Sequence, residues 1–215
     1  IIMMKKKEYC SLGIMSGTSL DGLDFSLVTT DGVSNIKNIF NEYYKFNNNF
    51  KISIKTLIKK FRSLDYNLVL NSKEFLYLNR KFTELTIKKI KTFLIKNSIS
   101  IDSIDVIGLH GNTMIHQPNN GLSIQLGDPR LISNRLKVKV ISNFRDNDIK
   151  SNGQGAPLVP IFHKCKFSES NKRVMIVNIG GISNFSFLIG KKIVMASDIG
   201  PGNKLIDELC SLTWQ

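Results

Sequence analysis

The chain has 215 residues, of which 42% are hydrophobic, so it can bury one large hydrophobic core or two smaller ones. This composition is that of a folded protein and not of a disordered one. Its net charge of +13 raises the question of a nucleic-acid or anionic-membrane partner. The lysines, however, are dispersed between apolar positions of helical segments, as on a solvated face, and we expect neither partner.

The cysteines and the N-terminal segment indicate the cellular compartment of the protein. Cys10, Cys165 and Cys210 are odd in number and far apart, which predicts neither a disulfide framework nor a zinc site. The N-terminal segment does not have the pattern of a signal peptide. No run approaches the roughly 20 apolar residues of a membrane span. We therefore expect a soluble protein in a reducing cytoplasm.

The first part of the chain is predicted to begin with an antiparallel meander. We expect strands at 9–15, 25–30 and 36–44, with a polar loop at 16–22 and a tight turn at Asp31-Gly32. Two helices should follow, one at 53–64 and one that begins near Asn71, with Glu74 three residues on. These helices would cover one face of the sheet.

More strands and short helices are predicted up to a domain boundary. Strands are expected at 105–109, 122–126 and 138–142, and helices at 129–136 and 158–164. Asp128-Pro129 is typical of a helix start. The polar stretch 168–172 is the expected boundary, so the first domain would cover 1–167 and the second 168–215.

The second domain repeats the opening of the first. Strands at 173–179, 185–189 and 193–197, a Gly-containing turn at 180–184 and a helix at 202–212 are predicted. Two units that each carry a hairpin loop of phosphate size would form a two-domain ATP clamp. We predict an α/β actin-like ATPase (ribonuclease H-like) fold, in which the first domain is complete and the second is truncated.

The loop after the first strand has the chemistry of a phosphate cradle, with backbone amides, hydroxyls and two carboxylates that suit magnesium. It lacks the Lys and following helix of a Walker motif, which favours a hairpin loop. An ordinary Gly-containing turn is the alternative. The candidate nucleotide-binding residues are Gly17, Thr18, Ser19, Leu20, Asp21, Gly22, Leu23 and Asp24.

Three further segments carry polar groups next to predicted strands. His110 directly follows a strand, and Arg145 and Asp148 lie in a loop after another, although lone histidines and surface turns are commonly structural. Asp198 lies between a strand and a helix, where it would act as a general base or as a helix N-cap.

Together these segments resemble the anhydro-N-acetylmuramic acid kinases of bacterial cell-wall recycling. The matching blocks, in family order, are Gly13–Asp24, His110-Gly111-x-Thr113, Gln125–Pro129, Phe144-Arg145-x-x-Asp148, Gly153–Pro160, Asn178–Asn184 and Asp198-x-Gly200-Pro201-Gly202-Asn203.

The resemblance implies a kinase that uses ATP and magnesium on an amino sugar. Asp198 would activate water against the anomeric carbon of 1,6-anhydro-N-acetylmuramic acid, and the freed 6-oxygen would take the γ-phosphoryl group. Residues 17–24 would hold the phosphates, while His110, Arg145 and Asp148 would lie on the sugar side. The resemblance is compatible with a homodimer. The alternatives are a non-catalytic remnant or sugar-binding module of that family, and nucleic-acid binding through the lysines.

Overall fold

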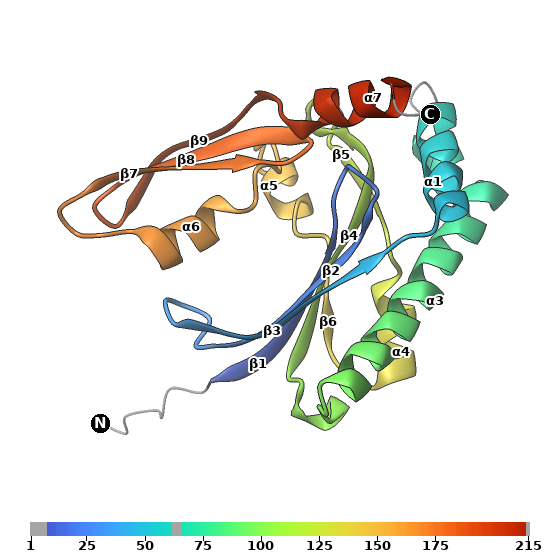
Figure 1. The fold of residues 1–215 in the computed structure, drawn as a ribbon, viewed down its shortest axis with the longest axis horizontal. Coiled ribbons are helices and arrows are strands. Elements are labelled where there is room, and N and C mark those ends of the chain that lie inside the picture. Colours follow the sequence, from blue (N-terminus) through green and yellow to red (C-terminus); the bar gives the residue numbers. More distant parts are fainter. Residues whose placement is uncertain (1–7, 62–65, 214–215) are drawn as a thin grey trace.

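The computed structural model describes residues 8–61 and 66–213, which form two β-sheets and the helices packed on them (Figure 1). The first sheet has the strand order β3-β2-β1-β4-β5, and β6 pairs with β4 on the edge of β4 that faces away from β1. Its strands are β1 (Tyr9–Ser16), β2 (Gly22–Thr30), β3 (Ile36–Lys45), β4 (Val106–Gln117), β5 (Leu122–Leu126) and β6 (Val140–Ile141).

Strand directions in the first sheet identify its fold class. The pairs β1–β2 and β2–β3 are antiparallel, whereas β4 runs parallel to β1 and β6 runs parallel to β4. An antiparallel meander extended by parallel strands is the arrangement expected for a ribonuclease H-like, actin-like domain. The α/β fold class predicted from the sequence is confirmed.

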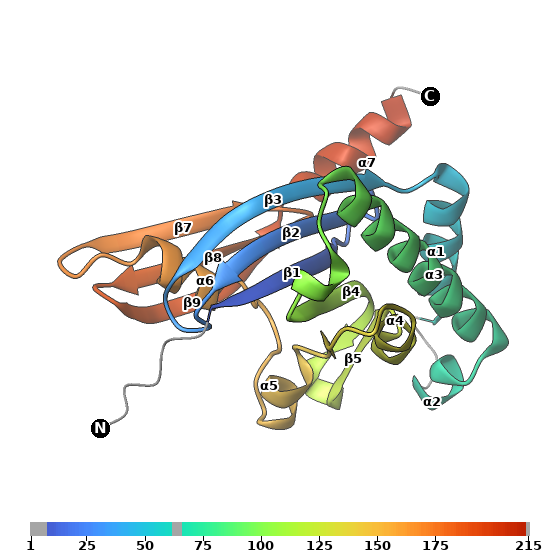
Figure 2. The ribbon, with the colours of Figure 1, turned by 90° about the horizontal axis from the view of Figure 1, so that it is seen from below.

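Helices join the strands and cover one side of the first sheet. The views agree that α1, α3 and α4 lie on one side of it and the second sheet on the other (Figure 2). The helices are α1 (Asn48–Phe61), α2 (Tyr66–Leu70), α3 (Lys73–Lys96), α4 (Pro129–Leu136), α5 (Asp146–Lys150), α6 (Pro160–Phe167) and α7 (Asn203–Thr213), with 3₁₀ turns at Ile101–Ser103 and Pro118–Asn120.

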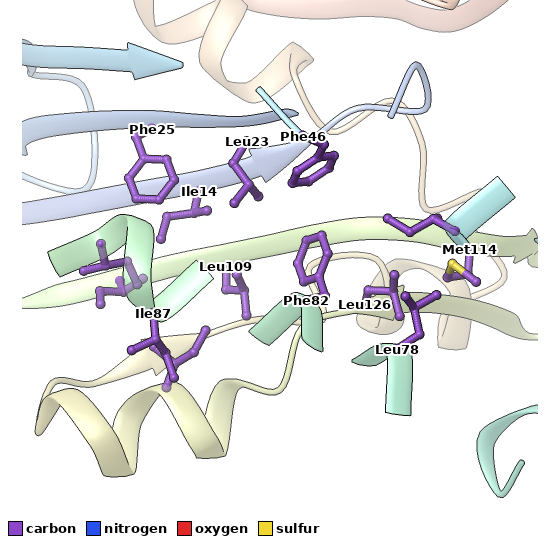
Figure 3. Close-up of a cluster of buried hydrophobic side chains, with 14 of the residues drawn as sticks. Ile14, Leu23, Phe25, Phe46, Leu78, Phe82, Ile87, Leu109, Met114 and Leu126 are labelled. Atoms are coloured by element: carbon purple, nitrogen blue, oxygen red, sulfur yellow. The ribbon is translucent and has the colours of Figure 1, made fainter. Parts of the chain in front are cut away.

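The core lies between the first sheet and α3. Phe82 of α3 is fully buried against Leu109 of β4 and Leu126 of β5 (Figure 3). Polar side chains of the same helix hold the chain after β5, because Asn79 Oδ1 accepts a hydrogen bond from Gly127 N at 2.7 Å and Thr83 Oγ1 accepts one from Asp128 N at 2.9 Å. These bonds fix where β5 ends and α4 begins.

The second sheet repeats the meander of the first. Its strands β7 (Arg173–Ile179), β8 (Ile182–Ile189) and β9 (Lys192–Pro201) are antiparallel in the order β7-β8-β9. On one face Ser186 and Leu188 are fully buried, and His163 of α6 lies with Nδ1 2.9 Å from Ser186 Oγ. On the other face Met175 and Val177 are exposed, so this sheet is packed on one side only.

Several predicted boundaries were wrong, because partner strands and caps decide where an element ends. The long helix begins at Lys73, after the N-cap Ser72, whose Oγ accepts from Phe75 N, close to the predicted start near Asn71. The first helix starts at Asn48 instead of 53, and its predicted end at 64 falls outside the described residues. The short helices α2 and α5 were not expected.

Two strands, β4 and β9, continue several residues past their predicted ends, and both changes move candidate site residues. His110 does not follow β4 but lies inside it, because residues 112–117 pair with β5. Asp198 does not lie between a strand and a helix but inside β9, which continues to Pro201. Sheet pairing supplies hydrogen-bond partners to segments whose Gly, Asn and Asp residues favour loops.

Candidate functional site

The hairpin loop between β1 and β2 is held by its own hydrogen bonds. Leu20 N donates to Gly17 O at 3.2 Å, and Ser19 Oγ donates to Asp21 Oδ1 at 2.7 Å. The side chains of Leu20 and Leu23 are buried in the core, with exposed fractions of 3% and 0%. A ligand at this loop would therefore meet only the backbone of these two leucines.

Asn112 of β4 supports the loop from beneath. Its side chain is fully buried, and Nδ2 donates to Gly17 O at 2.8 Å and to Ser16 Oγ at 3.1 Å. These bonds link the start of the loop to the neighbouring parallel strand. The sequence analysis assigned no role to Asn112. The residue lies within the matched motif at 110–113, and this motif was the sequence signal that could have identified it.

The second sheet brings its own hairpin loop against the first. A side-chain carbon placed on Gly181, between β7 and β8, would lie 2.9 Å from Thr18 Oγ1, so the two loops touch. The second loop is also tied to the start of α7, since Gly202 N donates to Gly181 O at 3.0 Å and Asn203 N donates to Gly180 O at 2.8 Å. Both hairpin loops and the beginning of α7 therefore meet at one place.

Two carboxylates follow the first loop. Asp21 is the last residue before β2, and Asp24 lies within β2. Burial, and then the charge of Asp21, raise the pKa of Asp24 above its ordinary value. Carboxylate oxygens are ligands that Mg²⁺ prefers. A cation bound between Asp21 and Asp24 would relieve this repulsion, so these two residues could hold one.

Arg145 and His110 form a half-buried pair near the two hairpin loops. Arg145 donates from one terminal nitrogen to Gly155 O at 2.5 Å, and its other terminal nitrogen lies 2.9 Å from His110 Nε2. A guanidinium can only donate, so Nε2 accepts, and the proton of a neutral His110 is on Nδ1, 3.0 Å from Gly111 O. Burial, followed by the charge of Arg145, lowers the pKa of His110. Both ring nitrogens of His110 are therefore engaged.

Asp148 closes the loop after α5. Its Oδ2 accepts from Gly155 N at 2.6 Å, and its backbone oxygen accepts from Gly153 N at 2.7 Å. The carboxylate thus holds the backbone that presents Gly155 O to Arg145. Its predicted contact with a sugar stays a prediction.

Asp198 of the second sheet acts electrostatically on two residues of the first part of the chain. Burial lowers the pKa of the Arg145 guanidinium, and the charge of Asp198 works against that lowering. Burial and Arg145 lower the pKa of His116, which Asp198 partly offsets. The structure therefore brings Asp198, Arg145 and His110 together, whereas sequence spacing alone left them far apart.

His116 was missed by sequence reasoning. It lies near the end of β4, with Nδ1 3.0 Å from Ser123 Oγ of β5. The available signal was that His110 and His116 are two of only three histidines in the chain and stand six residues apart.

A hollow of 680 Å³ lies over strands β1 to β4 of the first sheet. It is lined by Asp24 of β2, Tyr43 of β3, His110 of β4 and Phe144, among others. The hollow is therefore lined both by Asp24, a candidate for nucleotide binding, and by His110, a candidate for sugar binding.

Two meander units whose hairpin loops meet are the architecture of the actin-like ATPase fold class. A protein-family model described as anhydro-N-acetylmuramic acid kinase matches residues 9–215. The chain belongs to the anhydro-N-acetylmuramic acid kinase family.

Curated relatives carry the same family name. The chain is 42% identical to the anhydro-N-acetylmuramic acid kinase of Pelagibacter ubique over 207 residues, which is 94% of this chain and 54% of that protein. It is 39% identical to that of Haemophilus influenzae over 210 residues, or 97% of this chain and 52% of that protein. The chain spans about half the length of the curated relatives it matches. Within residues 8–61 and 66–213, no helix is long and apolar enough to cross a membrane.

Proposed function

We propose that this chain acts as an ATP-dependent kinase on 1,6-anhydro-N-acetylmuramic acid and yields N-acetylmuramic acid 6-phosphate, in a cytoplasmic pathway of peptidoglycan recycling. Asp198 takes a proton from water as the water oxygen bonds to the anomeric carbon. The bond from that carbon to the 6-oxygen breaks, and the 6-oxygen attacks the γ-phosphorus of ATP as ADP leaves. Such a transfer depends on positioning and on charge stabilisation more than on covalent help from the protein.

One observation carries the proposal. Asp198, on the second sheet, lies within electrostatic range of Arg145, which is paired with His110 on the first sheet. A base for water and a half-buried cation that suits an anionic sugar substituent are thereby combined at the junction of two sheets. Family membership makes the carboxylate of an N-acetylmuramic acid the anion to be expected there.

The nucleotide would lie at the two hairpin loops. The backbone of residues 17–19 and of Gly180-Gly181 would surround the phosphates, since glycines leave room for close approach. Asp21 and Asp24 would hold a magnesium ion, which neutralises the charge of the phosphates when it is bound. We include no nucleic-acid or membrane partner in the proposal, and a homodimer is compatible with it.

A coupled ADP-release assay with 1,6-anhydro-N-acetylmuramic acid, ATP and magnesium tests the proposal on the wild-type chain and on Asp198→Asn. We expect sugar-dependent turnover in the wild type that disappears in the variant. A sugar-binding module of the same family without turnover is the second candidate. Sugar binding by calorimetry in both proteins, with turnover in neither, would establish that second candidate.

A further inference from the structure

Asn184 of β8 lies directly opposite Asp198 of β9. The two residues are cross-strand partners in the antiparallel pair, so their side chains project from the same face of the sheet with Cβ atoms about 4.5–5.5 Å apart. The register shifts between Ser183 and Asn184, because Ser183 pairs with Gly200 and leaves Ile199 as an extra residue. This bulge sets the opposition, since a regular ladder continued from Ser183 would bring Ile199 opposite Asn184.

The shared face is the packed side of the second sheet. Asn184 alternates with Ser186 and Leu188, which are fully buried on the side that α6 covers. Asp198 itself is exposed. The side chain of Asn184 is therefore half-buried, with its oxygen covered by protein, and it lies beside the exposed carboxylate of Asp198.

The side-chain oxygen of Asn184 is buried and receives no hydrogen bond from any described residue. Leaving a buried acceptor without a donor costs about 1–3 kcal/mol. Its cross-strand neighbours on either side are Asn178 and Asp198. The carboxylate oxygens of Asp198 and the side-chain oxygen of Asn184 can all accept hydrogen bonds, so one molecule with two O–H donors, such as water, can bridge the two side chains.

We propose that Asn184 orients the water that Asp198 activates, an inference that rests on the proposed kinase function. The water donates one O–H to Asn184 Oδ1 and the other to the carboxylate of Asp198. Its lone pair is then directed at the anomeric carbon of the anhydro sugar. When the new carbon–oxygen bond forms, the proton passes to Asp198, the bond from the anomeric carbon to the 6-oxygen breaks, and that oxygen receives the γ-phosphoryl group from ATP.

Two variants of Asn184 test this inference through separate readouts. Asn184→Ala removes the acceptor, and we expect kcat to fall about 100-fold, as for misplacement of a reacting group, with the KM for the sugar changed less than twofold. Asn184→Asp keeps an acceptor of the same shape but adds a negative charge beside Asp198. Like charges raise the pKa of a carboxyl group, so the acidic limb of the pH profile of kcat should move to higher pH.

The control is Asn171→Ala, the same chemical change at an exposed residue before β7, and its kinetics should equal those of the wild type. A kcat of Asn184→Ala within threefold of the wild type, or a rise in KM that accounts for the whole loss, would overturn the inference and leave the kinase function intact. Absence of sugar-dependent turnover in the wild-type chain would overturn both. Circular dichroism melting of each variant identifies a loss that is caused by unfolding.

Discussion

A side-chain carbon on Gly202 would run into the carbonyl oxygen of Gly180, and it would also lie 2.6 Å from Ser183 Oγ. The start of α7 is therefore packed directly against the backbone of the second hairpin loop. Backbone atoms cannot rotate away as the end of a side chain can, so this approach requires glycine.

Gly202→Ala should destabilise the protein by about 2 kcal/mol, as overpacking of a well-packed site does. For a chain of this size that is a fall in melting temperature of about 4–8 °C, measured by calorimetry or circular dichroism. Gly180→Ala is the matched control, because its added carbon would lie 3.5 Å from Ile182 O, an ordinary contact. Equal melting temperatures for the two variants would contradict the prediction.

Asn112→Ala should lower the free energy of unfolding by about 1–3 kcal/mol, because it removes the donor to Gly17 O and Ser16 Oγ from a fully buried position. Urea denaturation measures the loss. Asn119→Ala, at an exposed residue just beyond β4, should stay within about 0.5 kcal/mol of the wild type. A neutral Asn112→Ala would show that the loop does not depend on this support.

The pH dependence of stability should report on His110. Its pKa in the folded state lies below the unfolded value of about 6.5, so the unfolded chain binds the proton more readily. The resulting stability is present above pH 6.5 and is lost as the pH falls through 6.5 toward the folded pKa. We expect His110→Gln to show a smaller loss of unfolding free energy than the wild type between pH 7.5 and pH 5, measured in urea.

The burial of His116 and His163 also lowers the pKa of each, so the His110→Gln variant should keep part of the wild-type slope. Parallel curves for wild type and variant over this range would mean that burial and the charge of Arg145 do not lower the pKa of His110.

Replacement of Asp148 distinguishes a structural role from contact with the sugar. Asp148→Ala removes the acceptor for Gly155 N and should cost about 1 kcal/mol of unfolding free energy, whereas Asp148→Asn keeps an oxygen at that position and should be close to neutral. Calorimetric titration with the anhydro sugar completes the test. Loss of sugar affinity in Asp148→Asn without loss of stability would show direct contact; Asp146→Ala, in the same short helix, is the control.

The sequence by itself determined the order of the elements and the repeat. Alternating apolar residues and the Asp31-Gly32 turn indicated the first meander, and Asp128-Pro129 predicted the start of α4, because these signals act within a few residues of the chain. The pattern of strand, loop and strand after Lys172 likewise indicated the second sheet before any contact was known. The family followed from ordered motifs and was confirmed.

Only the tertiary structure decided which of the candidate residues meet. Pairing with β5 and β8 carried β4 and β9 past their predicted ends, so His110 and Asp198 are strand residues with fixed neighbours. The opposition of Asn184 to Asp198 depends on a one-residue bulge, and the contact of Gly181 with Thr18 depends on how two sheets pack. No local pattern encodes these relationships, because they join segments that lie 14 to 163 residues apart in the chain and are selected by hydrogen bonding and packing across the whole fold.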